Sequence, residues 1–538
     1  MSLSPLAPAQ GNPRTTRIIC GVLIALAAIL LLAFGKTAFI FCLLLGLMLT
    51  GMPVSIALGL TVLTYLFTMT DVPTQSVAMK LFTGIESFEI MAVPFFILAG
   101  SFLTHGGVAR RMIAFATSLV GHLHGGLGLA GVLACAMFAA ISGSSAATVM
   151  AIGSILLPAM TKQGFPNKFG AGVITTSGSL GILVPPSVVI VLYSVSTNTS
   201  VGKMFIAGIV PGILLAVLLG TVTWFIARRN DYPRFRQFPQ HSSPVASLHA
   251  LWGLAACLLF TVVPPAVIIA LLSALLERFA PETAGGIGLF GVIISVAWLY
   301  FAYRVGRGFQ HPRLLAYEAQ RVWTTYWDSV WGLLLIVVVM GGIYGGVFTP
   351  TEAAAMSAVY SFFVSTVVYG DMPLRNLPKV LLGAASMSAM LLYIITNAVL
   401  FSFLLTSENI PQEIAGWILT QGFGPIAFLL VVNVLLLITG NVMEPSSIVL
   451  IMAPILFPVA MKLGIDPLHF GILIMVNMEV GMCHPPVGLN LYIASGITRM
   501  SITELTVVVL PWLIAMLGFL LLITYVPIIS LWLPHMVR

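Results

Sequence analysis

Two apolar stretches of the sequence are interrupted in the same way by small, polar and helix-breaking residues. The first carries Ser142-Gly143-Ser144-Ser145 and, further along, Gly178-Ser179-Leu180-Gly181 followed by Pro185-Pro186. The second carries Gly440-Asn441-Val442-Met443-Glu444-Pro445-Ser446 and, further along, Glu479-Val480-Gly481 followed by His484-Pro485-Pro486. Such residues can bind ions with few charged side chains. Unwound carbonyls and Ser or Asn oxygens suit a small cation, and half-helix N-termini suit an anion.

The two interruptions belong to an internal repeat with an offset of 300 positions. A gapless forward shift of residues 149–186 by 300 aligns identical residues that include Pro158, Lys162, Gly164, Gly181, Pro185 and Pro186 with Pro458, Lys462, Gly464, Gly481, Pro485 and Pro486. An earlier pair, Pro53-Val54-Ser55-Ile56-Ala57 and Pro350-Thr351-Glu352-Ala353-Ala354, occupies similar places in the two halves. Two structural repeats of this kind are typical of secondary transporters.

The elements that carry these residues must be membrane helices. Of the 538 residues, 59% are hydrophobic and only 7% are charged, whereas about 25% are charged in a soluble domain. At about 20 apolar residues per span, the chain has room for roughly 12 to 16 crossing or re-entrant segments. The composition excludes cytosolic enzymes, secreted domains and disordered scaffolds. It leaves a polytopic transporter, a channel or an intramembrane enzyme.

Broken helices inside a bilayer favour a binding site over a defect. Non-helical backbone at membrane depth leaves N–H and C=O groups unpaired, which is costly unless the segment is buried in protein or lines a hydrated cavity. A polar-tipped hairpin that faces a broken helix meets this condition, and two such pairs would give two ion sites beside one substrate cavity. The alternative for the Ser142–Ser145 motif alone is a close-packed helix interface, since small residues let membrane helices approach.

Four ionisable residues accompany the motifs. Glu444 and Glu479 are the nearest carboxylates, and each either binds a proton or cation or else pairs locally or reaches the membrane interface. His484 either titrates, contacts substrate or makes a structural hydrogen bond. Glu352 follows Pro350 at a predicted helix start, where we expect it to cap the helix.

The sequence predicts four segments along the chain. They are a tail with an extra membrane helix (1–37, apolar at 18–34), a first repeat (38–230) with a hairpin near 142–160, a basic cytoplasmic linker (231–330) with an inserted two-span hairpin at about 251–303, and a second repeat (331–538) with a hairpin near 440–460. Short basic clusters between the apolar stretches mark cytoplasmic loops under the positive-inside rule, and no base-stacking pattern accompanies them. We therefore expect no nucleic-acid partner.

Other motifs point to no enzyme chemistry. The five cysteines form no CxxC pair and are expected to be packing residues. The segment 126–131 matches GxGxxG but follows no predicted strand, so it is interpreted as a small-residue helix face. Because no ATP-binding loop, metalloprotease motif or Gly-x-Ser-x-Gly motif is present, we predict a protein that is not an enzyme and has no cofactor apart from coupling ions.

Six short segments follow one another along the chain: Gly51–Val54, Pro94–Gly100, Ser142–Ser145, Gly181–Ser187, Phe348–Ala355 and Pro485–Asn490. Together and in this order, they resemble the large permease subunit of a tripartite ATP-independent periplasmic (TRAP) transporter of the C4-dicarboxylate type. The resemblance covers residues 38–230 and 313–537. It implies an all-α polytopic fold of the ion-transporter superfamily, with inverted structural repeats, two re-entrant hairpins and broken helices. It also implies an elevator-like movement coupled to sodium, a small four-span membrane subunit, and a periplasmic solute-binding protein that delivers an organic anion.

The resemblance also implies which residues form the site. The first hairpin tip is Ser142, Gly143, Ser144 and Ser145, and it faces a break with Gly178, Ser179, Gly181, Pro185 and Pro186. The second tip contains Gly440, Asn441, Glu444 and Ser446, and it faces a break with Gly481, His484, Pro485 and Pro486. Sodium is expected near Ser144, Gly178, Asn441 and Gly481. Many relatives have threonine where this chain has His484, so a hydroxyl ligand is missing at this position, although the backbone carbonyl could still coordinate.

The sequence therefore predicts the multi-pass, sodium-coupled importer of a small organic acid, a C4-dicarboxylate, in a bacterial inner membrane. The alternative is a stand-alone ion-coupled dicarboxylate or anion transporter of the same superfamily, which would need neither partner. The extra N-terminal helix and the inserted spans depart from the usual large subunit. We expect them to brace the scaffold or contact the small subunit.

Overall fold

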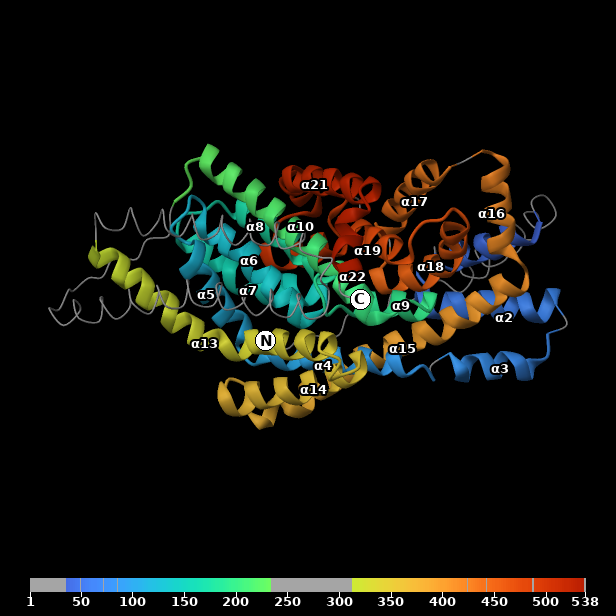
Figure 1. Cartoon of the computed structure of the whole chain (residues 1–538), viewed down its shortest axis with the longest axis horizontal. Coiled ribbons are helices and arrows are strands. Elements are labelled where there is room, and N and C mark those ends of the chain that lie inside the picture. Colours follow the sequence, from blue (N-terminus) through green and yellow to red (C-terminus); the bar gives the residue numbers. More distant parts are fainter. Residues whose placement is uncertain are drawn as a thin grey trace, which may run out of the picture.

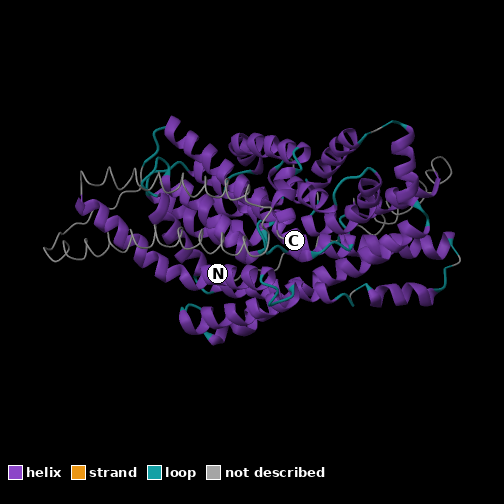
Figure 2. Ribbon diagram, viewed as in Figure 1, coloured by secondary structure: helices purple, strands orange, loops and turns teal. Residues whose placement is uncertain are grey.

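The structure is a computed structural model that describes residues 35–48, 50–70, 72–84, 86–233, 312–422, 424–441, 443–485 and 488–536. These residues form helices and connecting loops, with no strand among them (Figure 2). Eight helices in the described ranges are long and apolar enough to cross a membrane. The predicted all-α polytopic fold is confirmed. The predicted helix at 18–34 and the inserted spans at 251–303 lie outside the described residues.

The first half of the chain begins with an apolar helix, Gly35–Met48. It continues with α2 (Val54–Met69), α3 (Thr74–Thr83), η1 (Phe88–Met91), α4 (Ala92–His105), α5 (Val108–Val120), α6 (Gly126–Ser142), α7 (Ser145–Lys162), α8 (Asn167–Ser177), η2 (Gly178–Gly181), α9 (Val188–Thr197) and α10 (Val201–Arg229).

The second half follows the same order of hairpin, broken helix and long helix. Its elements are α13 (Pro312–Tyr344), α14 (Pro350–Phe363), η4 (Val364–Val368), η5 (Leu374–Asn376), α15 (Leu377–Ser407), α16 (Ile410–Thr420), α17 (Pro425–Gly440), α18 (Pro445–Lys462), α19 (Pro467–Cys483), α20 (Leu489–Thr498), α21 (Ile502–Tyr525) and α22 (Ile528–Met536). From α7 and α18 onward, the helix starts in the two halves differ by 300 or 301 positions.

The two halves also pack reciprocally. The counterparts in the two halves are α2 and α14, α4 and α15, α7 and α18, α8 and α19, α9 and α20, and α10 and α21. Contacts between the halves occur in matching pairs: α2 with α15 and α14 with α4, α7 with α20 and α18 with α9, and α10 with α19 and α21 with α8. Replacing both helices of one contact by their counterparts gives the other contact of the pair. This exchange is the pattern of two repeats related by a pseudo-two-fold axis. The repeat seen in the sequence is therefore a repeat of structure.

Helices α2, α3, α4, α14 and α15 lie along the lower side of the molecule in Figure 1, and the hairpins and broken helices lie above them. One hydrophobic core joins the two sides, and it includes fully buried aromatic side chains such as Phe138 and Phe401. Hydrogen bonds also link the repeats: Trp512 Nε1 donates to Thr223 Oγ1 at 2.9 Å. Buried polar groups on these helices thus find partners across the repeat interface.

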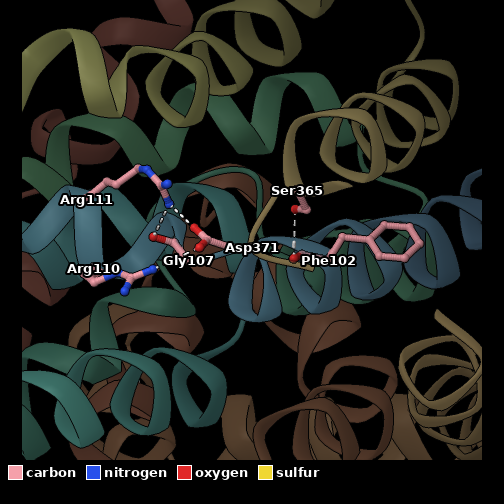
Figure 3. Close-up of polar contacts among 6 residues, drawn as sticks. All are labelled: Phe102, Gly107, Arg110, Arg111, Ser365 and Asp371. Carbon is pink, nitrogen blue, oxygen red and sulfur yellow. Dashed lines mark hydrogen bonds and ion pairs between the residues drawn. The ribbon is translucent and has the colours of Figure 1, made fainter. Parts of the chain in front are cut away.

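The corner between α4 and α5 is joined to the second repeat by charged and polar contacts (Figure 3). Arg110 and Arg111 both form ion pairs with Asp371, which lies between η4 and α15. Burial acts to raise the pKa of the Asp371 carboxyl, but the hydrogen bonds and charges of the two arginines outweigh it, so the pKa lies below its usual value. Close by, the Ser365 hydroxyl donates to the Phe102 carbonyl at 2.9 Å.

The start of α14 confirms the capping role predicted for Glu352. The Thr349 backbone N–H donates to Glu352 Oε2 at 2.8 Å, and the Glu352 N–H donates to Thr349 Oγ1 at 3.3 Å. These reciprocal bonds form a capping box, which satisfies two backbone donors that the helix itself leaves unpaired. Glu352 is thus a structural residue.

Candidate functional site

The first hairpin tip is the short loop between α6 and α7. Gly143 has a left-handed backbone (φ +58°), which glycine adopts without strain, and Ser144 is extended before α7 begins at Ser145. Ser142 Oγ lies 3.0 Å from Thr148 Oγ1, and the Thr148 hydroxyl donates to the Ser144 carbonyl at 2.8 Å. The tip is closed on itself, and Ser144 stays partly exposed while the serines on either side are buried.

This tip packs directly on the backbone of the first broken helix, between η2 and α9. A Cβ on Gly181 would lie 2.6 Å from the carbonyl carbon of Ser144, and one on Gly143 would lie 2.9 Å from the Pro186 carbonyl oxygen. Glycine at both positions is what lets the two backbones approach so closely. The remaining predicted residues of this break are all buried: Gly178, Ser179 and Pro185.

The second tip meets the second break in the same way. A Cβ on Gly481 would lie 3.0 Å from the Cα atom of Gly440. Asn441 follows α17 directly, and its Oδ1 lies 3.1 Å from His484 Nδ1. The structure therefore brings Gly440 and Asn441 of the second tip against Gly481 and His484 of the second break. Pro485 is half-buried beside His484, whereas Ser446 of the tip bonds to Glu444. Pro486 lies outside the described residues.

The two carboxylates near the second tip and the second break have different surroundings. Glu444 lies immediately before α18 and accepts a hydrogen bond from Ser446 at 3.1 Å, so it has a local partner. Glu479 is fully buried on α19. Its Oε1 accepts a hydrogen bond from the backbone N–H of Leu183, in the other repeat, at 3.2 Å. Glu479 thus links the repeats, which none of its predicted roles anticipated.

Asn490 lies beside the first tip, and the sequence assigned it no role. It is the second residue of α20, and its Nδ2 and Oδ1 lie 2.8 and 3.0 Å from the hydroxyl of Ser145. Since Ser145 begins α7, the N-termini of two helices from different repeats meet at this contact. The segment Pro485–Asn490 was the available signal, but a motif does not show which distant helix its residues face.

Several buried oxygen atoms around the breaks have no hydrogen-bond partner in the part of the chain that the structure describes. Among them are Ser177 Oγ and Ser187 Oγ, which flank the first break, and Asn477 Oδ1, which precedes the second. Ser177 and Asn477 are equivalent under the repeat. Buried oxygens without a partner require an explanation such as a bound water or ion, and oxygen atoms are the ligands of hard cations.

Helix ends of both polarities gather at the tips and breaks. Elements α6, η2, α17 and α19 end there, and α7, α9, α18 and α20 begin there. Helix N-termini carry partial positive charge that favours anions, while C-terminal carbonyls favour cations. The arrangement can therefore hold an anion and small cations close together with few charged side chains.

Comparison with known proteins places the chain in one family. Residues 41–307 and 264–529 match the family described as "Tripartite ATP-independent periplasmic transporter, DctM component". The C4-dicarboxylate TRAP transporter large permease protein DctM of Rhodobacter capsulatus is 58% identical, over 92% of this chain and 98% of that relative. The protein of the same name from Pseudomonas aeruginosa is 45% identical, over 86% and 90%.

A solved structure shares the fold. The Alcanivorax borkumensis YdaH transporter, described as having an unusual topology, has a TM-score of 0.50 and 16% sequence identity, over 86% of this chain and 88% of that one. This similarity concerns the fold alone, whereas the sequence relatives are named as permeases and not as enzymes. The chain therefore belongs to the DctM family of tripartite ATP-independent periplasmic transporters, as a large membrane permease subunit.

Proposed function

We propose that the chain uses a sodium gradient to import a C4-dicarboxylate. The observation that carries this proposal is the pair of tip–break contacts, at Gly181 with Ser144 and at Gly481 with Gly440. The substrate class is supported by the two relatives named as C4-dicarboxylate permeases, which are 58% and 45% identical to this chain.

In this proposal, sodium binds at both breaks, near Ser144 and Gly178 in the first repeat and near Asn441 and Gly481 in the second. The unpartnered oxygen of Ser177, immediately before Gly178, supports a cation at the first break. The carbonyl ends of η2 and α19 supply further oxygen ligands of the kind that hard cations prefer. The bound cations would offset the negative charge of the dicarboxylate, because there are few charged side chains near the tips to balance it.

The carboxylates of the substrate would meet the helix N-termini. The contact between Ser145 and Asn490 brings the N-termini of α7 and α20 together, with the Asn490 amide 2.8 Å from the serine hydroxyl. Backbone N–H groups at the first turn of a helix have no partner within the helix and can donate to an anion. This region is the proposed substrate site.

We also propose how the subunit works in its complex. The hairpins and broken helices would move, in an elevator-like way, against the layer that contains α2, α4, α14 and α15. A small four-span membrane subunit and a periplasmic solute-binding protein would complete the transporter in the bacterial inner membrane. The family assignment supports both partners, because a tripartite transporter has three components.

Reconstitution tests this proposal. The chain and both partners are placed in liposomes, and uptake of radiolabelled succinate is followed with an inward sodium gradient or with potassium in its place. We expect uptake only with sodium and with the binding protein present. Uptake that is unchanged without sodium contradicts the coupling. Uptake with neither partner present would instead support a stand-alone transporter.

A further inference from the structure

The first broken helix is held by a side chain from the other repeat. Between η2 and α9, the backbone N–H groups of Ile182 and Val184 donate to the carbonyls of Ser179 and Leu180, at 3.1 and 3.0 Å. The N–H of the intervening residue, Leu183, instead donates to Glu479 Oε1 at 3.2 Å.

We propose that Glu479 is a positioning residue that holds the first tip–break pair in its binding geometry, an inference that rests on the proposed function. Leu183 is fully buried, so without Glu479 its N–H group would lose the partner that the structure gives it. An unpaired buried donor is unfavourable, and the irregular backbone would shift to pair it elsewhere. Gly181, which contacts the first tip, is two residues away and would shift with it.

Glu479 also connects the two breaks. It lies on α19 two residues before Gly481, which contacts the second tip at Gly440. One side chain therefore joins the backbone of the second break to the backbone of the first. The repeat-related residue, Ser179, has a shorter side chain, and its hydroxyl donates to the Thr176 carbonyl of its own helix at 2.7 Å. The carboxylate link is therefore not duplicated by the pseudo-symmetry.

A direct ionic role is the competing explanation. Within the described ranges, Glu479 forms no ion pair with a basic side chain, and its Oε2 has no hydrogen-bond partner. If Oε2 were itself a ligand of the coupling ion, the charge of Glu479 would be essential. If Glu479 acts through Leu183, the essential features are an acceptor oxygen and the reach of the side chain.

Three substitutions separate these explanations. Glu479→Gln keeps an oxygen that can accept from the Leu183 N–H and removes the ionisable carboxyl group. Glu479→Asp keeps the carboxyl group on a side chain that is one methylene shorter, and Glu479→Leu removes both the carboxyl group and the acceptor. Glu504, an exposed carboxylate that pairs with Lys168 at 3.1 Å, is the matched control, as Glu504→Gln and Glu504→Leu.

Each variant is reconstituted with both partner subunits, and succinate uptake is measured as a function of sodium concentration. We expect Glu479→Gln to keep uptake and half-saturating sodium within about 3-fold of wild type. Glu479→Leu and Glu479→Asp should lower uptake about 10-fold or more and raise half-saturating sodium, because a displaced binding group loses activity steeply. The Glu504 variants should match wild type.

An active Glu479→Asp with an inactive Glu479→Gln would overturn the proposal in favour of a required charge. Full activity of Glu479→Leu would overturn it as well. Thermal unfolding of each purified variant identifies any that fail to fold, and if Glu479→Leu is among them, the comparison of Gln with Asp still decides. If wild-type uptake does not depend on sodium, only the sodium coupling is refuted. The role of Glu479 is still tested, because the variants can be ranked by uptake and by half-saturating succinate.

Discussion

Gly181→Ala adds a single methyl group where the first break touches the first tip. The new Cβ would lie 2.6 Å from the Ser144 carbonyl carbon and 2.7 Å from the Ser145 backbone nitrogen, whereas ordinary contact begins at 3.4 Å. The two backbones must therefore separate by about 0.8 Å, because no side-chain rotation can relieve contacts between close-packed backbone atoms. A misplacement of about 1 Å in a positioned site can cost about 100-fold, so we expect succinate uptake to fall about 10- to 100-fold.

Gly481→Ala provides a graded comparison in the second repeat. Its Cβ would lie 3.0 Å from the Gly440 Cα, so a separation of only about 0.4 Å suffices, and the loss should be smaller, less than about 10-fold. Gly518→Ala is the control, because nothing lies within 4 Å of the added methyl group. Uptake in reconstituted liposomes, normalised to folded protein, measures all three. Wild-type uptake by Gly181→Ala would refute the tip–break contact as the functional geometry.

Three further substitutions test other contacts by thermal unfolding. Asn490→Ala leaves the buried Ser145 hydroxyl without its partner, so it should destabilise the protein by about 1–3 kcal/mol and lower uptake; no change in either would contradict the contact. Asp371→Asn should lower the free energy of unfolding by on the order of 1 kcal/mol at pH 7, since the ion pairs of Asp371 with Arg110 and Arg111 are partly exposed. Because the folded-state pKa of Asp371 is depressed, the difference in stability between wild type and Asp371→Asn should persist above about pH 4 and vanish as the pH falls through the folded-state pKa. A difference in stability that is independent of pH would refute the ion pairs. Thr349→Ala should cost about 1 kcal/mol through the lost helix cap, and an unchanged unfolding temperature would argue against the cap.

The tips and breaks were predictable from sequence because of what a bilayer demands of the backbone. Glycine, proline and serine motifs at membrane depth must be buried in protein or line a cavity, and their recurrence after about 300 positions indicated one tip and one break in each half. Which tip faces which break came from the family resemblance. The structure accordingly places Gly181 against Ser144 and Gly481 against Gly440. The order of the hairpins and broken helices likewise follows from the repeat.

The contacts between repeats were not predictable. Glu479 and Leu183 are 296 positions apart, and Asn490 and Ser145 are 345 apart. A pairing between two distant helices leaves no periodicity in a single sequence, so the burial and the partner of each side chain emerge only once the helices pack. For the same reason, the sequence could not distinguish the roles of Glu444 and Glu479, an ion or proton site or a local pairing. In the structure, Glu444 has a local partner in Ser446, and Glu479 has a partner, Leu183, in the opposite repeat.

The most direct test of the proposed ion sites is the sodium dependence of uptake in Ser144→Ala and Asn441→Ala. Thr68→Ala serves as the control, since Thr68 is exposed and its hydroxyl donates to the Thr64 carbonyl of its own helix at 2.6 Å. If the two tips bind the coupling ions, both tip variants should raise half-saturating sodium about 10-fold or more, a loss expected for one ligand to a charged group, while the control matches wild type. Half-saturating sodium that is unchanged in both tip variants would contradict the assignment of the ion sites to the tips and breaks.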